Sequence, residues 1–346
     1  MHLHLLPILL LLPLAQPREI VFPPASPVHL QQQQQHHHHL NDEDQFTVQR
    51  FRGLTTFANL PYVDCFGGGE EEEGEGEGER YDIAILGAPF DTAVTARPGA
   101  RYGPQGIRLG SQRIVPEANW DMYTGENSFV DWAKIVDCGD APLTFLDNTV
   151  ALKQLDKAHK PDISQEADRM PDTWDPKVLG GGVSHYAGVN HGTFLHLAHE
   201  EGLILNSSIH AGIRAPWIRP KGDLRNDLRC GFEIVKARDL DRQGTAGVVK
   251  TLKERVGNSN VYISVDIDVL DPAFAPATGT PEVGGWSTRE LLTIIDGLEG
   301  VKLIGADVVE VAPIYDDAGG ITALAAAEIA NSLLKLMVKT PVEAAA

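Results

Sequence analysis

Residues 264–285, SVDIDVLDPAFAPATGTPEVGG, constrain the fold of this chain more than any other stretch. The β-branched run over residues 262–269 predicts a buried strand. Asp266 and Asp268 are two residues apart, so in a strand both side chains point to one face, near its carboxyl end. Two neighbouring carboxylates are costly to bury unless a cation lies between them. We therefore interpret this stretch as a metal site, rather than as one capping acid beside one solvated acid.

Length and composition agree with a globular α/β protein rather than a disordered or fibrous one. The 346 residues are 42% hydrophobic and include 34 glycines, which suits one large α/β domain or two smaller ones. The formal net charge of −19 argues against nucleic acid and anionic membrane surfaces as partners and favours a cationic substrate. Three cysteines without a CxxC pair indicate neither a disulfide framework nor a zinc knuckle.

The 264–285 stretch also resembles the signature of the ureohydrolase family, which contains arginases and agmatinases. The resemblance implies a three-layer α/β/α fold with a mainly parallel sheet, and two Mn²⁺ ions at the carboxyl edge of that sheet. It implies a small cationic guanidino substrate, hydrolysed to urea and an amine, and assembly as a homo-oligomer.

Three further residues match family positions. Asp268 would hold metal and orient or deprotonate the attacking water. His191, in NHGTF, matches the histidine that binds substrate and protonates the leaving amine, and Glu310 matches the acid that binds the guanidinium. NHGTF replaces the loop with which arginases hold the α-amino and carboxylate groups, so the resemblance favours agmatine over arginine.

Two family elements, GGDH and D-x-H-x-D, are absent from this sequence. Asp172, in DTWDP, matches the last acid of D-x-H-x-D and is the third candidate metal ligand after Asp266 and Asp268. GGGVSH follows DTWDP, so we interpret His185 as a loop residue rather than a ligand. A strand–helix–strand unit, roughly 30 residues or more, is therefore predicted to be missing near residues 160–172. An exon lost from a gene model, or a splice variant, is the hypothesis that accounts for it.

The N-terminal region carries a separate prediction. Residues 1–18 have the length and apolar centre of a secretory signal peptide, although they lack Lys and Arg before that centre. Residues 19–79 include QQQQQHHHH and an acidic Gly/Glu run, and are predicted to be low-complexity or extended. The ureohydrolase domain is predicted over residues 80–340. Secretion is the expected localisation, with the cytoplasm as the second choice.

The pattern of apolar residues and turns predicts the main elements of that domain. Asp91, Arg97 and Arg101, in the glycine- and proline-rich loop after the first strand, are interpreted as fixing the loop, with substrate contact as the alternative. The predicted strands cover residues 81–87, 134–138, 206–214, 262–269 and 301–311, and the predicted helices cover 103–110, 149–159, 194–201, 287–298 and 322–338.

Three functions remain open from the sequence. The first is agmatine hydrolysis to putrescine and urea, with the activity of this chain in question because ligand motifs are missing. The second is a non-catalytic family member that acts as an oligomer subunit or binding module. The third is hydrolysis of guanidinobutyrate or another guanidino compound.

Overall fold

The computed structural model describes residues 53–65, 81–159, 191–217 and 220–342. The predicted signal peptide, Asp172 and the GGGVSH segment lie outside these residues. The described strands are β1 Ile83–Gly87, β2 Ile135–Asp140, β3 Ser208–Ile213, β4 Phe232–Lys236, β5 Asn260–Asp266 and β6 Lys302–Val309. The described α-helices are α2 Gly103–Gly110, α3 Asn148–His159, α4 Phe194–Glu200, α5 Pro220–Arg229, α6 Asp239–Val256, α7 Thr288–Gly297 and α8 Ile321–Lys339.

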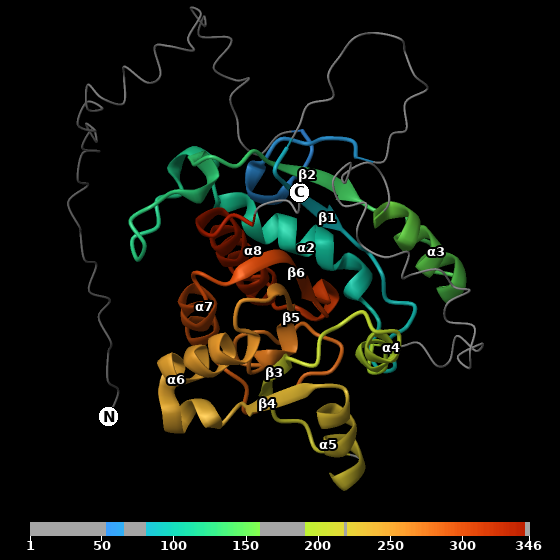
Figure 1. Cartoon of the computed structure of the whole chain (residues 1–346). Helices are drawn as coiled ribbons and strands as arrows, with labels where there is room; N and C mark the ends of the chain where they lie inside the picture. Colours follow the sequence, from blue (N-terminus) through green and yellow to red (C-terminus); the bar gives the residue numbers. More distant parts are fainter. Residues whose placement is uncertain (1–52, 66–80, 160–190, 218–219, 343–346) are drawn as a thin grey trace, which may run out of the picture. The chain divides into compact units, whose positions relative to one another are not determined.

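The predicted α/β class with parallel strands is confirmed. Every strand and helix expected from the sequence is present, while β4, α5 and α6 were not predicted. Within the described residues the strands form three separate parallel pairs, β1 with β2, β3 with β4, and β5 with β6. In Figure 1 these pairs follow one another in the order β2–β1, β6–β5 and β3–β4.

Apolar residues on one face of each pair form the core. Val261, Ile263 and Val265 of β5 pack against the cluster that contains buried residues of α6, α7 and α8. A second cluster joins β1 and β2 to α8 and to the segment around Phe57. Helix α8 is long and apolar enough to cross a membrane by length and composition alone, but most of it is buried in these clusters, as expected of a core helix.

The segment before β1 is fastened to β2. Tyr62 forms a parallel bridge with Asp137, and Cys65 is disulfide-bonded to Cys138. An odd cysteine count without a motif gave no sign of this bond, because the pairing depends on a contact between residues 73 apart in the sequence. The sequence indicated no disulfide framework, and the structure contains one disulfide between these two cysteines.

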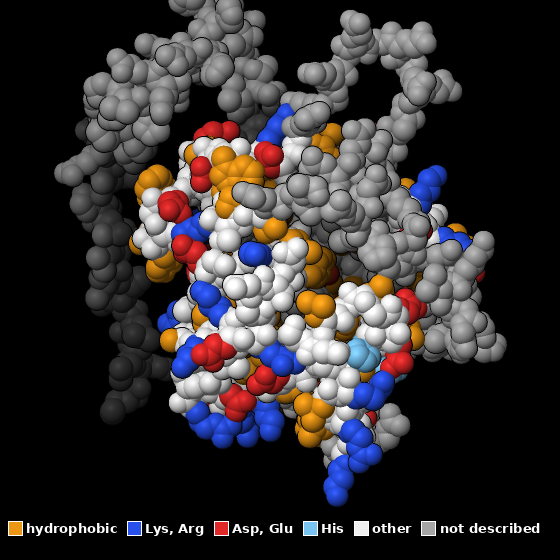
Figure 2. Space-filling model, viewed as in Figure 1, with side chains coloured by type: hydrophobic (Ala, Val, Ile, Leu, Met, Phe, Trp, Pro, Cys, Tyr) orange, Lys and Arg blue, Asp and Glu red, His pale blue; other side chains and the backbone are white. Residues whose placement is uncertain are grey.

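Charged side chains of both signs cover the face shown in Figure 2. Lys and Arg gather at the end of the molecule formed by α5 and α6, with Asp and Glu between them on the neighbouring surface. The negative net charge is therefore not spread evenly over this face.

Candidate active site

Strand β5 and the turn after it carry the two carboxylates singled out in the sequence. The strand ends at Asp266, and residues Ile267–Val269 form a single 3₁₀ turn. The Asp266 side chain accepts a hydrogen bond from the backbone N–H of Asp268, 3.1 Å away. The prediction that both acids lie on one strand was therefore wrong, because this local hydrogen bond turns the chain one residue after β5.

Although only one of them is in the strand, the two acids interact. Burial raises the pKa of Asp266, and the negative charge of Asp268 raises it further. Burial also raises the pKa of Asp268, while the positive charge of Arg214 and a hydrogen bond from Thr280 oppose that rise. Two neighbouring, partly buried acids that both resist ionisation form a site that a cation would stabilise.

Arg214, just after β3, holds the turn that carries these acids. Its guanidinium donates to the backbone carbonyls of Asp268, Leu270 and Glu282. The Thr280 hydroxyl donates to Asp268 Oδ2 at 3.3 Å. Neither residue was identified in the sequence as part of the site; the strand-ending position of Arg214 was the available signal.

Glu310 follows β6 directly and has an unusual backbone conformation. Its φ is +62°, a left-handed backbone conformation that residues other than glycine rarely adopt. The chain just after Glu310 is held by an antiparallel bridge between Thr278 and Val311 and by a hydrogen bond from Ala312 N–H to Ala277 O at 2.9 Å. Such a conformation persists only where the surroundings fix it, and it is common where side chains must be aimed at a ligand.

His191, in the turn before α4, lies beside Glu310. The distance between His191 Nδ1 and Glu310 Oε1 is 3.4 Å, and the other ring nitrogen, Nε2, is 2.7 Å from the Thr95 hydroxyl. The structure therefore brings together two of the predicted catalytic residues, which are more than one hundred positions apart. The role of Thr95 was not predicted.

The loop that carries Thr95 is fixed by its own charged residues. Arg97 donates to the carbonyls of Thr278 and Gly279 and lies over the Tyr315 ring, 4.5 Å from its centre. Asp91 accepts from Arg101 Nε at 2.7 Å and from Gly99 N–H at 2.8 Å. The loop-fixing interpretation of Asp91, Arg97 and Arg101 is thus confirmed by these contacts.

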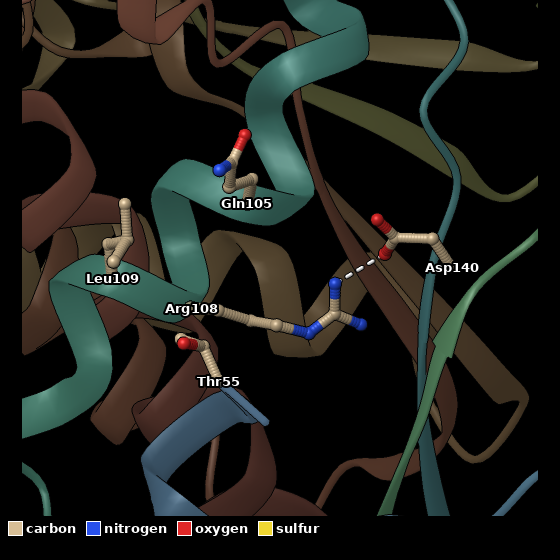
Figure 3. A pocket seen from close by; sticks show the side chains of 5 residues that line it. All are labelled: Thr55, Gln105, Arg108, Leu109 and Asp140. Atoms are coloured by element: carbon tan, nitrogen blue, oxygen red, sulfur yellow. Dashed lines mark hydrogen bonds and ion pairs between the residues drawn. The ribbon is translucent and has the colours of Figure 1, made fainter. Parts of the chain in front are cut away.

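A pocket of about 240 Å³ lies away from these residues. It is lined by Thr55, Gln105, Arg108, Leu109 and Asp140, and none of the predicted site residues borders it. Figure 3 shows the Arg108 guanidinium pointing toward the Asp140 carboxylate across this pocket. The Arg108 guanidinium in this pocket is already paired with Asp137 and Asp140.

Comparison with known proteins identifies the family. A sequence profile of the arginase family matches residues 81–182 and 168–335. The chain therefore belongs to the arginase family. The Schizosaccharomyces pombe protein "Putative agmatinase 1" is 45% identical over 341 aligned positions, covering 84% of this chain and 84% of that protein. The agmatinase of Escherichia coli O7:K1 is 34% identical over 280 positions, covering 73% of this chain and 86% of that enzyme.

A solved structure of the family has the same fold. Proclavaminate amidino hydrolase from Streptomyces clavuligerus aligns with a TM-score of 0.68 at 30% identity, over 84% of this chain and 99% of that one. The alignment with the S. pombe protein also has a notable length. Because 84% of 346 residues is about 291, about 50 of its 341 positions are residues of the relative that face gaps in this chain.

The resemblance to the family implies a centre with two Mn²⁺ ions, and a solved structure of Trypanosoma cruzi formiminoglutamase contains Mn²⁺. Among the described residues, no three His, Cys, Asp or Glu side chains come together as metal ligands. Asp266 and Asp268 supply carboxylates of the kind that a hard cation such as Mn²⁺ accepts, but two carboxylates without imidazole do not hold two ions. The described residues therefore do not fit the two-metal centre.

Proposed function

We propose that this chain is an agmatinase-type enzyme by descent, in which water cleaves a guanidino group to give urea and an amine. The observation that carries the proposal is the contact between His191 and Glu310 at 3.4 Å, beside the carboxyl end of the strand that bears Asp266. The agmatinases among its relatives support agmatine as the substrate and putrescine as the amine product.

The chemistry assigned to these residues follows from their groups. The Glu310 carboxylate accepts hydrogen bonds from the planar N–H donors of the guanidinium, a pairing with matched geometry. Asp268 orients a water molecule and takes its proton as the water oxygen bonds to the guanidinium carbon. The bond from that carbon to the amine nitrogen then breaks, and His191 donates the proton that the leaving nitrogen needs.

Glu310 and His191 also limit the choice of substrate. Both recognise the guanidino end, and neither is a cation placed to bind a carboxylate at the far end of arginine. We therefore expect agmatine to be used in preference to arginine. Guanidinobutyrate or another guanidino compound is the alternative substrate.

The described residues do not supply enough ligands for two metal ions, and this leads to a proposal about this particular chain. We propose that it lacks the strand–helix–strand unit that carries GGDH and D-x-H-x-D, and that as written it binds Mn²⁺ weakly and hydrolyses agmatine poorly. The candidate metal ligand Asp172 would remain, but it lies outside the described residues. A non-catalytic role, as an oligomer subunit or binding module, is the competing proposal for the chain in this form.

A substrate panel tests the function. The full chain is purified in the presence of Mn²⁺, and urea release is measured with agmatine, guanidinobutyrate and arginine, alongside the Glu310→Gln variant as the control. Slow urea release with agmatine as the best substrate, abolished in Glu310→Gln, supports the proposal. Release that is fastest with arginine, or unaffected by the substitution, contradicts it.

We also propose that the mature protein is secreted. A disulfide between Cys65 and Cys138 is typical of an oxidising compartment, which agrees with the signal peptide expected in residues 1–18. N-terminal sequencing of the protein from culture medium and from cell lysate tests this. An intact N-terminus found only inside cells contradicts it. We further propose that the protein forms homo-oligomers. Sedimentation velocity of the purified protein measures the size of the assembly.

A further inference from the structure

The hydroxyl of Thr95 lies against the candidate active site, and the proposed reaction gives it no role. Its oxygen is 2.7 Å from Nε2 of His191, while the other ring nitrogen, Nδ1, is 3.4 Å from Glu310 Oε1. The two partners of the ring differ in chemistry. An ionised carboxylate only accepts hydrogen bonds, whereas a hydroxyl both donates and accepts. Each ring nitrogen of His191 therefore has a partner of a different kind.

The backbone that carries Thr95 is fixed by contacts with distant parts of the chain. Two residues further on, Arg97 donates to the carbonyl of Thr278 at 2.8 Å. The Tyr315 hydroxyl donates to the carbonyl of Pro98, also at 2.8 Å. Because these bonds fix the loop just after Thr95, its side chain is presented to the site from a fixed backbone.

The residues on the other side of the ring are also held in place. The backbone N–H of His191 donates to the carbonyl of Ala93 at 3.4 Å, which ties it to the loop of Thr95. Glu310 has a fixed left-handed backbone, and its Oε2 lies against Gly279, where an added Cβ would be 3.5 Å away. Oε1 is therefore the carboxylate oxygen that faces the ring, and it faces Nδ1.

The hydroxyl of Thr95 can bond Nε2 in every protonation state of the ring. A neutral ring beside ionised Glu310 carries its proton on Nδ1, and Nε2 then accepts a hydrogen bond from the hydroxyl. A protonated ring carries a proton on both nitrogens, and Nε2–H then donates to the hydroxyl oxygen. The hydroxyl thus fixes the orientation of the ring, and the carboxylate selects the nitrogen that carries the proton.

We propose that Thr95 is a positioning residue, which holds Nε2 of His191 so that Nδ1 is the nitrogen that gives its proton to the leaving amine. Glu310 binds the guanidinium in the proposed function, so Nδ1 faces the end of the substrate where the bond breaks. The fate of this proton rests on the proposed function, whereas the orientation of the ring does not.

The proton transfer balances as follows. The leaving nitrogen takes the electron pair of the breaking carbon–nitrogen bond and accepts the Nδ1 proton of the protonated ring. The ring of His191 is then neutral, and its remaining proton, on Nε2, donates to the Thr95 oxygen. A proton from water restores Nδ1. Thr95 therefore bonds the ring both before and after the transfer.

Spectra of the ring nitrogens test the orientation on the full chain without substrate. Histidine is labelled with ¹⁵N, and the signals of His191 are identified by their absence in His191→Gln. In alkaline buffer, where the ring is neutral, we expect the proton on Nδ1. Thr95→Val keeps the branched shape and removes the hydroxyl. Within the described residues Nε2 then has no other hydrogen-bond partner, so the ring turns away from Glu310.

The expected change is a fall of about fivefold in the ratio of the Nδ1–H to the Nε2–H form in Thr95→Val, the effect of one lost hydrogen bond. Thr95→Ser keeps a hydroxyl and should restore the ratio. Thr92→Val is the matched control, because the Thr92 hydroxyl lies in the same loop but is 2.6 Å from Asn148 Oδ1 and bonds there instead. This control should leave the ratio unchanged.

Three outcomes of the spectra overturn the inference: an unchanged ratio in Thr95→Val, an equal fall in Thr92→Val, or no recovery in Thr95→Ser. Urea release from agmatine tests the fate of the proton. A lower kcat in Thr95→Val with the same KM supports it, and a change in KM alone overturns it. If the spectra behave as expected but the wild type releases no urea, Thr95 still orients the ring and the proposed function fails.

Discussion

Asp137 is the buried charge on which the N-terminal segment depends. Its side chain is fully buried and accepts two hydrogen bonds from Arg108, at 2.8 and 2.9 Å, and one from Phe57 N–H at 2.7 Å. Asp140 contacts the same guanidinium but is 40% exposed. A buried ion pair contributes little net stability compared with apolar packing, but removal of one partner leaves the other uncompensated.

Substitution of these two acids should therefore have unequal effects. Asp137→Asn should lower the free energy of unfolding by about 3 kcal/mol, because buried Arg108 then keeps only the partly exposed Asp140 as its counter-charge. Asp140→Asn, on the same guanidinium, should lower it by less than about 1 kcal/mol, because the exposed pair is screened by water. Urea denaturation followed by circular dichroism measures both, and equal losses would contradict this account.

Asp121 provides a pH-dependent prediction. Burial raises its pKa, but the hydrogen bond from Lys335 and that from Tyr123 N–H outweigh burial, so the pKa is lowered in the folded protein. The stability it contributes is present above the unfolded pKa of about 3.9, and is lost as the pH falls through the lower folded pKa. The stability difference between wild type and Asp121→Asn should thus be large at pH 6 and smaller near pH 3.

The control for Asp121 is a neighbouring exposed acid. Glu126 contacts Lys339 and its side chain is 57% exposed. Glu126→Gln should change the free energy of unfolding by less than about 0.5 kcal/mol at either pH. A difference for Asp121→Asn that stays constant between the two pH values would show that the ionised carboxylate is not the source of the stability.

At the scale of elements, the start of α7 is fixed by local sequence. Ser287 and Glu290 form both reciprocal hydrogen bonds of a capping box. Ser287→Ala should lower the free energy of unfolding by about 1 kcal/mol, because a helix N–H loses its partner. Thr293→Ala, in the same helix but exposed, should cost clearly less; comparable losses in urea denaturation would argue against the cap.

Elements were predictable where their signals are local. The β5 strand was recognised from its β-branched run, but its end was missed, because the Asp266 side chain competes for the backbone N–H of Asp268. Helix α6 was missed because its glycines at 244 and 247 weaken the helical pattern, and φ at Gly244 is +68°. Its placement depends on packing against β3, β4 and α7, which a sequence pattern does not contain.

In the candidate site, too, only the residues that belong to a recognisable motif were predicted. Asp266, Asp268, His191 and Glu310 were identified through motifs, and the structure sets His191 against Glu310. Thr95 was missed because it is 96 residues from His191 and carries no motif. The roles of Asp266, Asp268, His191 and Glu310 in catalysis remain predictions that the substrate panel tests.

At the scale of the whole molecule, the disulfide joins the segment before β1 to β2. Cys65 and Cys138 are 73 residues apart, and a cross-link across a loop of this length restricts the unfolded chain. The double variant Cys65→Ser/Cys138→Ser should lose about 4 kcal/mol of unfolding free energy on the chain-entropy account. A reductant should lower the wild-type unfolding midpoint and leave that of the double variant unchanged. A wild-type midpoint that is insensitive to reductant contradicts the bond.

The whole sheet raises the central question, which is whether this chain lacks a strand–helix–strand unit. The most direct measurement is the sequence of the natural transcript across the codons for His159 to His191. Our account predicts a longer message, with codons for roughly 30 residues or more that encode a strand–helix–strand unit with the GGDH and D-x-H-x-D elements. A message that reads through this region as in the present sequence would contradict the account, and the chain's role would then lie in binding rather than catalysis.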